Sequence, residues 1–301
     1  MYYIGIDGGG STSRLLGTDK NLTVIGRHKG GPTNLAALEA ETVRENIRQL
    51  IEEFNCQTGT HLKDCEAICI GSAGVDGDRN TGLMESIFRD IGFNGKIKIV
   101  TDAVVALASK TKGEAGIVII SGTGSIGYAI DKSGHALRCG GWGAFIDDSG
   151  SGYKIGMEAI RYALMDYDGR GQKTILTSKI MEFFELKRID EVLKHVYSIP
   201  FDKAKIAKLS QVVRTAAEAG DSIALLIEST AAEDLALLAK TLIGRSQLST
   251  AQVILSGSIL LHNPHIQEGF RQAVEAAYPD VTITPQDVES EMGAVYLAMQ
   301  L

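Results

Sequence analysis

The chain has 301 residues and a formal net charge of −7 at pH 7; 44% of its residues are hydrophobic and 22% are charged. These values are typical of a globular protein of about two domains, and the acidic balance argues against a surface that binds nucleic acid or an anionic membrane. The chain starts with neither a basic segment nor a small-residue cleavage site, and no apolar run reaches the ~18 residues that span a bilayer. We therefore expect a cytoplasmic protein with no nucleic-acid and no membrane partner.

The first part of the chain predicts alternating strands and helices. Val43, Ile47, Leu50 and Phe54 recur at helical spacing, whereas short apolar runs bounded by turn residues indicate strands. Strands are expected at residues 2–6, 14–18, 24–29, 67–72 and 96–100, and helices at 38–54 and 81–91. This alternation favours an α/β layer with a mixed sheet.

A glycine-rich turn occurs twice, each time between two expected strands. The first reads Gly8-Gly-Gly-Ser11 and the second Gly122-Thr-Gly-Ser125, before an expected strand at 126–130. Backbone N–H groups in such a turn can surround an anion, and glycine lets the backbone approach phosphates without a Cβ clash. Two copies in the same setting predict a duplicated domain that holds a phosphate chain.

The part of the chain after the second turn is predicted to be mostly helical. The polar segment 110–115 before it reads as a connection and hinge. Helices are expected at residues 152–165, 173–184, 189–195, 203–219, 222–243, 264–277 and 292–301, with strands at 252–256 and 281–284.

Two acidic residues follow or end expected strands. Asp7 lies beside the first glycine turn, where a carboxylate suits Mg²⁺ better than the alternative role of capping the turn. Asp102 follows the strand 96–100, and it either caps the next helix or lies in the cleft beyond the carboxyl ends of the strands.

The segment Gly140–Gly152 is the densest in unusual residues. It contains the chain's only tryptophan, Trp142, two adjacent aspartates and five glycines. Trp142 either packs on the C–H face of a sugar or lies in the core. Because so many glycines lower stability, we favour a substrate loop. Further on, Gly257-Ser258 either seats an adenosine or is an ordinary turn between a strand and a helix.

Taken together, these motifs resemble the ATP-dependent sugar kinases of the actin-like ATPase superfamily, and within it the N-acetylglucosamine kinase branch of the BadF/BadG/BcrA/BcrD-type ATPases. The resemblance covers essentially the whole chain. Residues 7–12 and 121–125 are similar to the two phosphate motifs, 255–259 to the adenosine motif, and 101–103 and 291–294 to the connecting segments. The run from Gly140 to Tyr153 is the most specific part, and residues 168–175 resemble bacterial kinases that accept both N-acetylmuramic acid and N-acetylglucosamine.

The resemblance implies a duplicated ribonuclease H-like fold, with two domains that each hold a mixed sheet flanked by helices and with ATP and sugar in the interdomain cleft. The domains would be residues 1–113 and 114–301, with a C-terminal helix at about 290–301 that packs back on the first. Members of the family often pair, so a homodimer is expected, although nothing in the sequence identifies its interface.

The implied reaction is transfer of phosphate from ATP, with Mg²⁺, to the 6-hydroxyl of N-acetylglucosamine or N-acetylmuramic acid. Asp102 would be the general base and Asp7 would hold the metal. The residues implied to contact the sugar are Asn34, Ser72, Asp102, Ser125, Gly141, Trp142 and Asp148. The residues implied to contact ATP are Gly9, Gly10, Ser11, Thr12, Gly122, Thr123, Gly124, Ala207, Gly257 and Ser258.

The chain departs from the family at one place in the substrate loop. Relatives usually have Asp-Glu-Gly where this chain has Asp148-Ser-Gly150, and Asp147 stands where they usually have glycine. Either Asp147 or Asp148 could therefore face the sugar.

Four alternatives remain from the sequence. A glucosamine kinase would share the same motifs. An ATP-driven iron–sulfur activator needs cluster-ligating cysteines at the domain interface, whereas Cys65 and Cys69 flank the start of a strand without a second pair. A sugar sensor with a DNA-binding helix-turn-helix is disfavoured by the acidic charge, and a ROK-type kinase by the absence of a cysteine-rich zinc motif.

Overall fold

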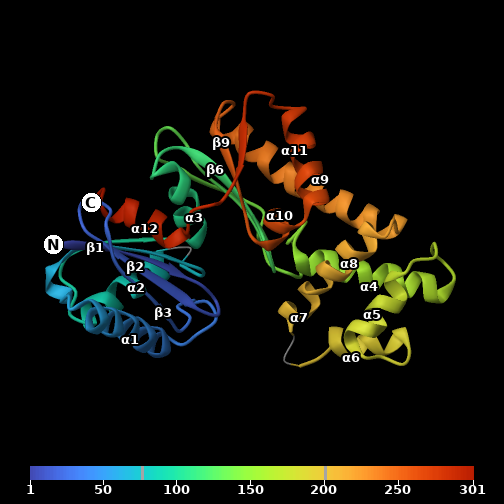
Figure 1. Cartoon of the computed structure of the whole chain (residues 1–301), viewed down its shortest axis with the longest axis horizontal. Helices are drawn as coiled ribbons and strands as arrows, with labels where there is room; N and C mark the ends of the chain where they lie inside the picture. The colour runs from blue at the N-terminus through green and yellow to red at the C-terminus, as the bar shows by residue number, and fades with distance from the viewer. Residues whose placement is uncertain (76–77, 200–201) are drawn as a thin grey trace. The chain divides into compact units, whose positions relative to one another are not determined.

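The computed structural model describes residues 1–75, 78–199 and 202–301. The chain forms two compact units: Met1–Ala115 together with Gln286–Leu301, and Gly116–Pro285. Each unit contains one five-stranded sheet with helices packed on it (Figure 1). None of the described helices is both long enough and apolar enough to cross a membrane.

The sheet of the first unit has the strand order β3-β2-β1-β4-β5. Its first three strands form an antiparallel meander, and β4 and β5 continue the sheet in parallel with β1. The strands are β1 Tyr2–Gly8, β2 Ser13–Thr18, β3 Val24–Gly30, β4 Cys65–Ser72 and β5 Lys96–Val100. This arrangement brings the first glycine turn and the end of β4 to the same edge of the sheet, because β1 and β4 run in the same direction.

Helices cover both faces of this sheet. On one face Ile4 and Ile6 of β1 join a core with buried side chains of α1 (Ala40–Thr58) and α2 (Asp78–Asp90). On the other face a smaller core joins β4 to α3 (Asp102–Thr111) and α12 (Ser290–Ala298). The last helix of the chain, red in Figure 1, therefore completes the first unit.

The backbone of α12 lies directly against its neighbours in the first unit. A Cβ atom on Gly5 of β1 would overlap the carbonyl oxygen of Glu291, and one on Gly293 would overlap the carbonyl oxygen of Val105 in α3. The atoms that would be struck belong to backbone, so side-chain rotation cannot relieve the overlap. These two glycines fix the start of α12 beside β1 and α3.

Gly293→Ala should destabilise the protein by about 3 kcal/mol, because the added methyl group must push apart two packed helices. The midpoint of urea unfolding would fall accordingly. Gly82→Ala, within α2, is the matched control: a Cβ there meets nothing within 4 Å, and alanine favours a helix by about 1 kcal/mol. An unchanged midpoint for Gly293→Ala would contradict the close packing.

The sheet of the second unit repeats that of the first. Its order is β10-β9-β6-β7-β8, in which β6, β7 and β8 form the antiparallel meander and β9 and β10 the parallel extension. The strands are β6 Gly116–Ser121, β7 Ser125–Ile130, β8 Ala136–Cys139, β9 Gln252–Ser256 and β10 Thr282–Pro285. The predicted duplication and the predicted fold class are thereby confirmed.

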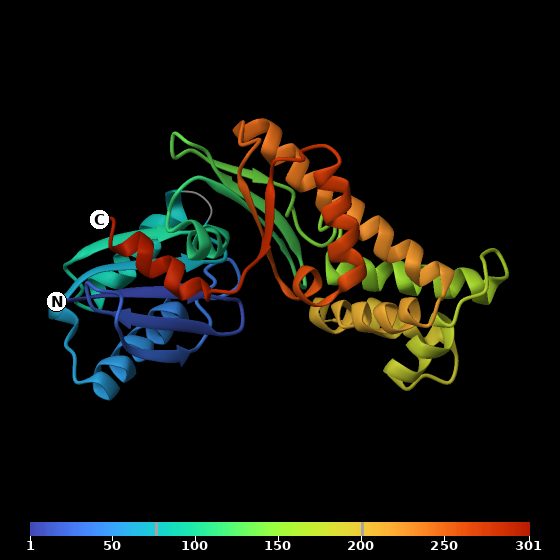
Figure 2. The same ribbon diagram turned by 45° about the horizontal axis from the view of Figure 1, so that its top comes forward.

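The helices of the second unit follow the prediction with three corrections. The expected helix 203–219 is divided near Lys208, the expected helix 189–195 begins with a 3₁₀ segment, and the short α10 was not predicted. Long α9 packs beside α4, α8 and α11 (Figure 2). The helical segments are α4 Gly152–Asp168, α5 Leu176–Phe184, the 3₁₀ segment Ile189–Val192, α6 Leu193–Val196, α7 Lys203–Ala207, α8 Leu209–Glu218, α9 Ser222–Ser246, α10 Ser258–His262 and α11 Pro264–Glu275.

Candidate active site

The first glycine turn is an exposed loop with unused backbone donors. The N–H group of Gly9 donates to the carbonyl of Thr12 at 3.0 Å, whereas those of Gly10, Ser11 and Thr12 find no acceptor within the described part of the chain. A Cβ atom on Gly8 would overlap the hydroxyl of Thr33, so glycine is required there. Three exposed and unsatisfied N–H groups in a row are suited to an anion such as phosphate.

Buried hydroxyl groups hold this turn in place. Ser13 donates to the hydroxyl of Thr33 at 3.1 Å, and Ser72 donates to the carbonyl of Thr33 at 3.0 Å. The N–H group of Thr33 in turn reaches the carbonyl of Gly9 at 3.3 Å. Ser72 is fully buried, so here its hydroxyl positions the loop, and its predicted contact with sugar stays a prediction.

Asn34 lies beside the first turn. Its side-chain oxygen accepts from the N–H group of Ala36 at 2.9 Å, and a Cβ atom on Gly74 would overlap that oxygen. A Cβ atom on Gly10 would lie 3.9 Å from its side-chain nitrogen. The amide of Asn34 therefore stands next to the turn that carries the unused donors.

Two acidic residues from other elements of the first unit act on Asp7. The pKa of Asp7, at the end of β1, is raised to about 6; burial is the largest cause, the charges of Asp102 and Glu291 add to it, and Arg14 opposes it. The Arg14 guanidinium is 3.9 Å from the Asp7 carboxylate. Ionised Asp7 is thus poorly compensated by the protein itself, which fits a nearby divalent cation.

The donor set is small, and this limits how such a cation would be held. Among the described residues no group of three or more histidine, cysteine, aspartate or glutamate side chains could hold a metal ion. Mg²⁺ commonly keeps several waters and uses one or two carboxylates plus substrate phosphates. Asp7 next to the first glycine turn fits that mode of binding.

Asp102 is the first residue of α3, and the helix cap is its neighbour Thr101. The alternative that Asp102 is the N-cap is therefore wrong. One carboxylate oxygen of Asp102 accepts from the N–H group of Ala103 at 2.9 Å, as expected for an acid in the first turn of a helix.

The second glycine turn brings the predicted nucleotide residues of the second unit together. The N–H groups of Thr123 and Gly124 find no acceptor within the described residues. A Cβ atom on Gly122 would lie 3.9 Å from the nitrogen of Ser258, and one on Gly152 would lie 3.2 Å from the carbonyl oxygen of Ala207. Gly257 has φ +84° and lies directly against Ser121. The second glycine turn, the residues that follow β9 and the end of α7 thus lie next to one another.

A cavity of about 390 Å³ opens beside this place, lined by α8 and α10. The Arg214 guanidinium is held by the Glu218 carboxylate at 2.8 Å and the His262 carbonyl at 2.7 Å. Two of its lining residues, Ser258 and Ile259, belong to the predicted adenosine motif 255–259. The residues that the sequence missed are Ser210, Gln211, Arg214, Thr215, Glu218, His262 and Asn263. Most of them are polar positions of helices, which in a sequence look like an ordinary solvent-exposed face.

The segment Gly140–Gly152, which the sequence predicts to be a substrate loop and which keeps that name below, is exposed at Trp142, Phe145 and Ile146. Its glycines are required by its backbone. Gly140, Gly141, Gly143 and Gly150 all have φ between +70° and +97°, a region that favours glycine. Trp142 is 63% exposed, so the alternative that it lies in the core is wrong. The Arg138 guanidinium lies 4.6 Å from the centre of its ring.

The two adjacent aspartates of the loop face different neighbours. Asp148 is buried, forms an ion pair with Lys203 at 2.5 Å, and lies 3.2 Å from a Cβ atom placed on Gly124. Asp147 instead lies near Gly140, and its charge acts on Asp234 of α9. Asp148 is therefore the one beside the second turn, and no local sequence pattern indicates its partner Lys203.

Ser125 has the same kind of role as Ser72. Its hydroxyl donates to the carbonyl of Ser149 at 2.7 Å and is buried. It therefore ties β7 to the substrate loop, and its direct contact with sugar stays a prediction.

The cysteines do not form a cluster site. All four are free thiols, and Cys65 and Cys69 are buried in β4. Burial raises the pKa of each of these two thiols to about 12, whereas a ligand must be a thiolate. The activator alternative therefore has no support from these residues.

Comparisons with known proteins agree over nearly the whole chain. The family model of the BadF/BadG/BcrA/BcrD ATPases matches residues 4–298. The chain is 37% identical over 299 residues to an N-acetylmuramic acid/N-acetylglucosamine kinase of Clostridium acetobutylicum, covering 99% of this chain and 98% of that one. It is 30% identical over 311 residues to an N-acetyl-D-glucosamine kinase of Dictyostelium discoideum, covering 99% and 97%. A solved protein of Chromobacterium violaceum, provisionally named an N-acetylglucosamine kinase, has a TM-score of 0.80 at 25% identity and 98% coverage of both chains.

Proposed function

Since this chain belongs to the BadF/BadG/BcrA/BcrD ATPase family, we propose that it is an ATP-dependent kinase that phosphorylates the 6-hydroxyl of an N-acetylhexosamine, either N-acetylglucosamine or N-acetylmuramic acid. The observation that carries this proposal is the pair of glycine turns with unused N–H groups, one in each copy of a duplicated sheet. Phosphoryl transfer requires mainly positioning and charge neutralisation, which such turns provide.

The proposal assigns the nucleotide to three features. The N–H groups of Gly10, Ser11 and Thr12 in one turn, and those of Thr123 and Gly124 in the other, would donate to phosphate oxygens. The cavity of about 390 Å³ beside Ser258 is large enough for an adenosine. Asp7 would hold Mg²⁺, which neutralises the developing charge on the phosphates.

Asp102 would accept the proton of the sugar hydroxyl. Its first-turn position in α3 keeps its backbone fixed, and one oxygen is already held by the Ala103 N–H group. A carboxylate can act as such a base if it lies within hydrogen-bond reach of the hydroxyl. The proton would move to Asp102 as the bond between the sugar oxygen and the γ-phosphorus forms and the bond between that phosphorus and ADP breaks.

Of the residues predicted to contact the sugar, those with exposed side chains would touch it directly. Asn34 and the exposed Trp142 are the accessible candidates, since Ser72 and Ser125 are buried. A tryptophan ring packs on the C–H groups of a sugar because both surfaces are apolar. Asp148, which is buried and paired with Lys203, would orient the loop that carries Trp142.

An ADP-release assay with purified protein, ATP and Mg²⁺ tests the proposal. Turnover is expected with N-acetylglucosamine or N-acetylmuramic acid, and much less with glucose. Higher turnover with glucosamine than with the N-acetylated sugars would identify a glucosamine kinase instead. The 6-deoxy analogue of the preferred sugar should be inactive if the 6-hydroxyl is the acceptor. The absence of turnover on all of these sugars would overturn the proposal.

A further inference from the structure

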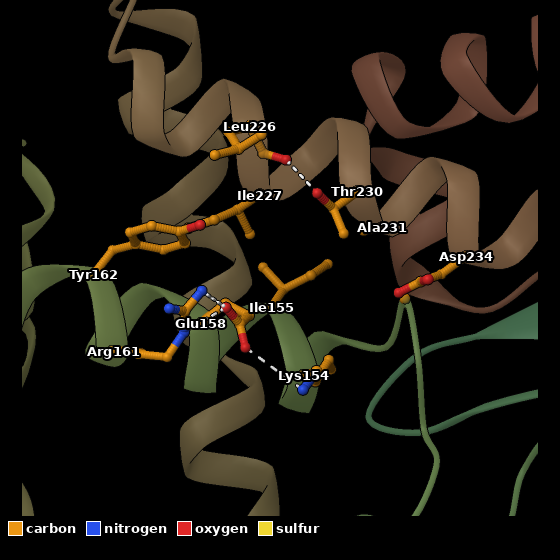
Figure 3. A pocket seen from close by; sticks show the side chains of 11 residues that line it. Lys154, Ile155, Glu158, Arg161, Tyr162, Leu226, Ile227, Thr230, Ala231 and Asp234 are labelled. Carbon is orange, nitrogen blue, oxygen red and sulfur yellow. Dashed lines mark hydrogen bonds and ion pairs between the residues drawn. The ribbon is translucent and has the colours of Figure 1, made fainter. Parts of the chain in front are cut away.

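A second cavity of the second unit, about 210 Å³ in volume, lies between α4 and α9 (Figure 3). Ile155, Ile227 and Ala231 form apolar parts of its wall and are almost fully buried. The ring of Tyr162 and the half-exposed Leu226 complete the apolar lining. A dry apolar cavity of about 150 Å³ is enough to bind benzene, so this one has room for a six-membered ring with a short substituent.

The charged groups of the wall are paired, with one exception. Glu158 binds Arg161 at 2.5 Å and Lys154 at 3.5 Å, as the dashed lines in Figure 3 mark. Asp234 has neither a hydrogen bond nor an ion pair within the described residues.

The groups around Asp234 make its ionised form unfavourable unless a cation binds beside it. Burial raises the pKa of Asp234, the charges of Asp147, Glu233 and Glu158 raise it further, and Lys154 alone lowers it. The Thr230 hydroxyl cannot help, because it donates to the Leu226 carbonyl at 2.9 Å. Among the described residues, the wall thus offers a carboxylate with no cation in contact with it, beside apolar side chains.

This cavity also reaches the substrate loop. Gly150, near the end of that loop, is part of the wall. Its carbonyl accepts from the Ser121 hydroxyl at 2.8 Å, at the start of the second glycine turn. A Cβ atom on Gly150 would meet the Leu235 side chain of α9 at 2.5 Å. A molecule in the cavity would therefore press against the loop that carries Asp148.

We propose that this cavity binds a small organic ammonium ion with an apolar body, and that its occupancy is transmitted to the substrate loop through Gly150. The apolar body lies between Ile155 and Ile227, and the ammonium group pairs with Asp234. The proposal concerns binding and does not depend on the proposed kinase activity.

Benzylamine is a suitable probe, with benzyl alcohol as its neutral analogue. In NMR titrations of the full-length protein, benzylamine should shift the methyl signals of Ile155 and Ile227 and the amide signal of Gly150 in a saturable way. Methyl signals of the first unit, such as that of Ile68, should not move. Benzyl alcohol should bind at least about tenfold more weakly, because it lacks the charge that pairs with Asp234.

Asp234→Asn should reduce the affinity for benzylamine to that for benzyl alcohol. Asp280→Asn, which removes an exposed carboxylate elsewhere in the same unit, should leave the tenfold preference unchanged. The proposal is overturned if Ile155 and Ile227 do not respond, if Gly150 does not respond, if the alcohol binds as tightly as the amine, or if Asp234→Asn keeps the preference.

Discussion

Asp102→Asn should lower kcat about a thousandfold and change the KM for the sugar by less than about threefold, because general-base catalysis contributes in this range. The amide keeps an oxygen that can accept from the Ala103 N–H group, as Asp102 does at 2.9 Å, so the start of α3 should be preserved. What the variant loses is the ability to take up the proton of the hydroxyl.

Steady-state kinetics over both substrates would measure this effect. Asp64→Asn, an exposed residue of the same unit, is the matched control and should retain wild-type kcat. A thermal unfolding midpoint close to that of the wild type would exclude misfolding. Turnover near the wild-type level in Asp102→Asn would mean that Asp102 is not the base and serves only the helix.

Asp7→Asn should stabilise the metal-free protein while reducing its turnover. The pKa of Asp7 is raised to about 6 in the folded protein, against about 4 in an unfolded chain. Between these two values the folded state binds more protons than the unfolded one, so the contribution of Asp7 to stability falls as the pH rises. Above pH ~6 the ionised Asp7 carboxylate lowers the free energy of unfolding by its full amount. For a pKa difference of about two units this amount is at most about 3 kcal/mol.

Urea unfolding in EDTA at several pH values would measure this difference. The variant should be more stable than the wild type at pH 7.5, by roughly 1–3 kcal/mol, and the two should converge near pH 4. Turnover with Mg²⁺ should fall at least about a hundredfold, because stabilisation of transition-state charge by a metal is worth several kcal/mol. A variant as stable as the wild type at every pH would contradict the effect of burial and of the neighbouring acids.

Local patterns predicted the sheets well. The strands 96–100 and 252–256 have the observed bounds, and the two glycine turns led to the duplicated strand order. Apolar runs, glycine turns and helical spacing are short-range signals, so a single sequence carries them. Helix ends were less accurate: the division near Lys208 leaves Lys208 itself with helical angles, and a sequence offers no signal for so slight a break.

The site was predicted less completely, because its residues are joined by long-range contacts. Lys203 pairs with Asp148 across 55 positions of the chain, and α8 and α10 meet at a cavity although a long helix separates them in the sequence. The exposure of Trp142 depends on positive φ angles at its glycine neighbours and on Arg138. Such features appear only when the chain is folded.

The placement of α12 also determines when the first unit can be finished. Its residues 290–298 are synthesised after all of the second unit, yet they cover β1 and pack on α3 without space for a methyl group at Gly5 or Gly293. Until they emerge from the ribosome, the small apolar core of β4 and α3 has one side open. The N-terminal unit is therefore begun first and completed last, and during synthesis the second unit can fold before it.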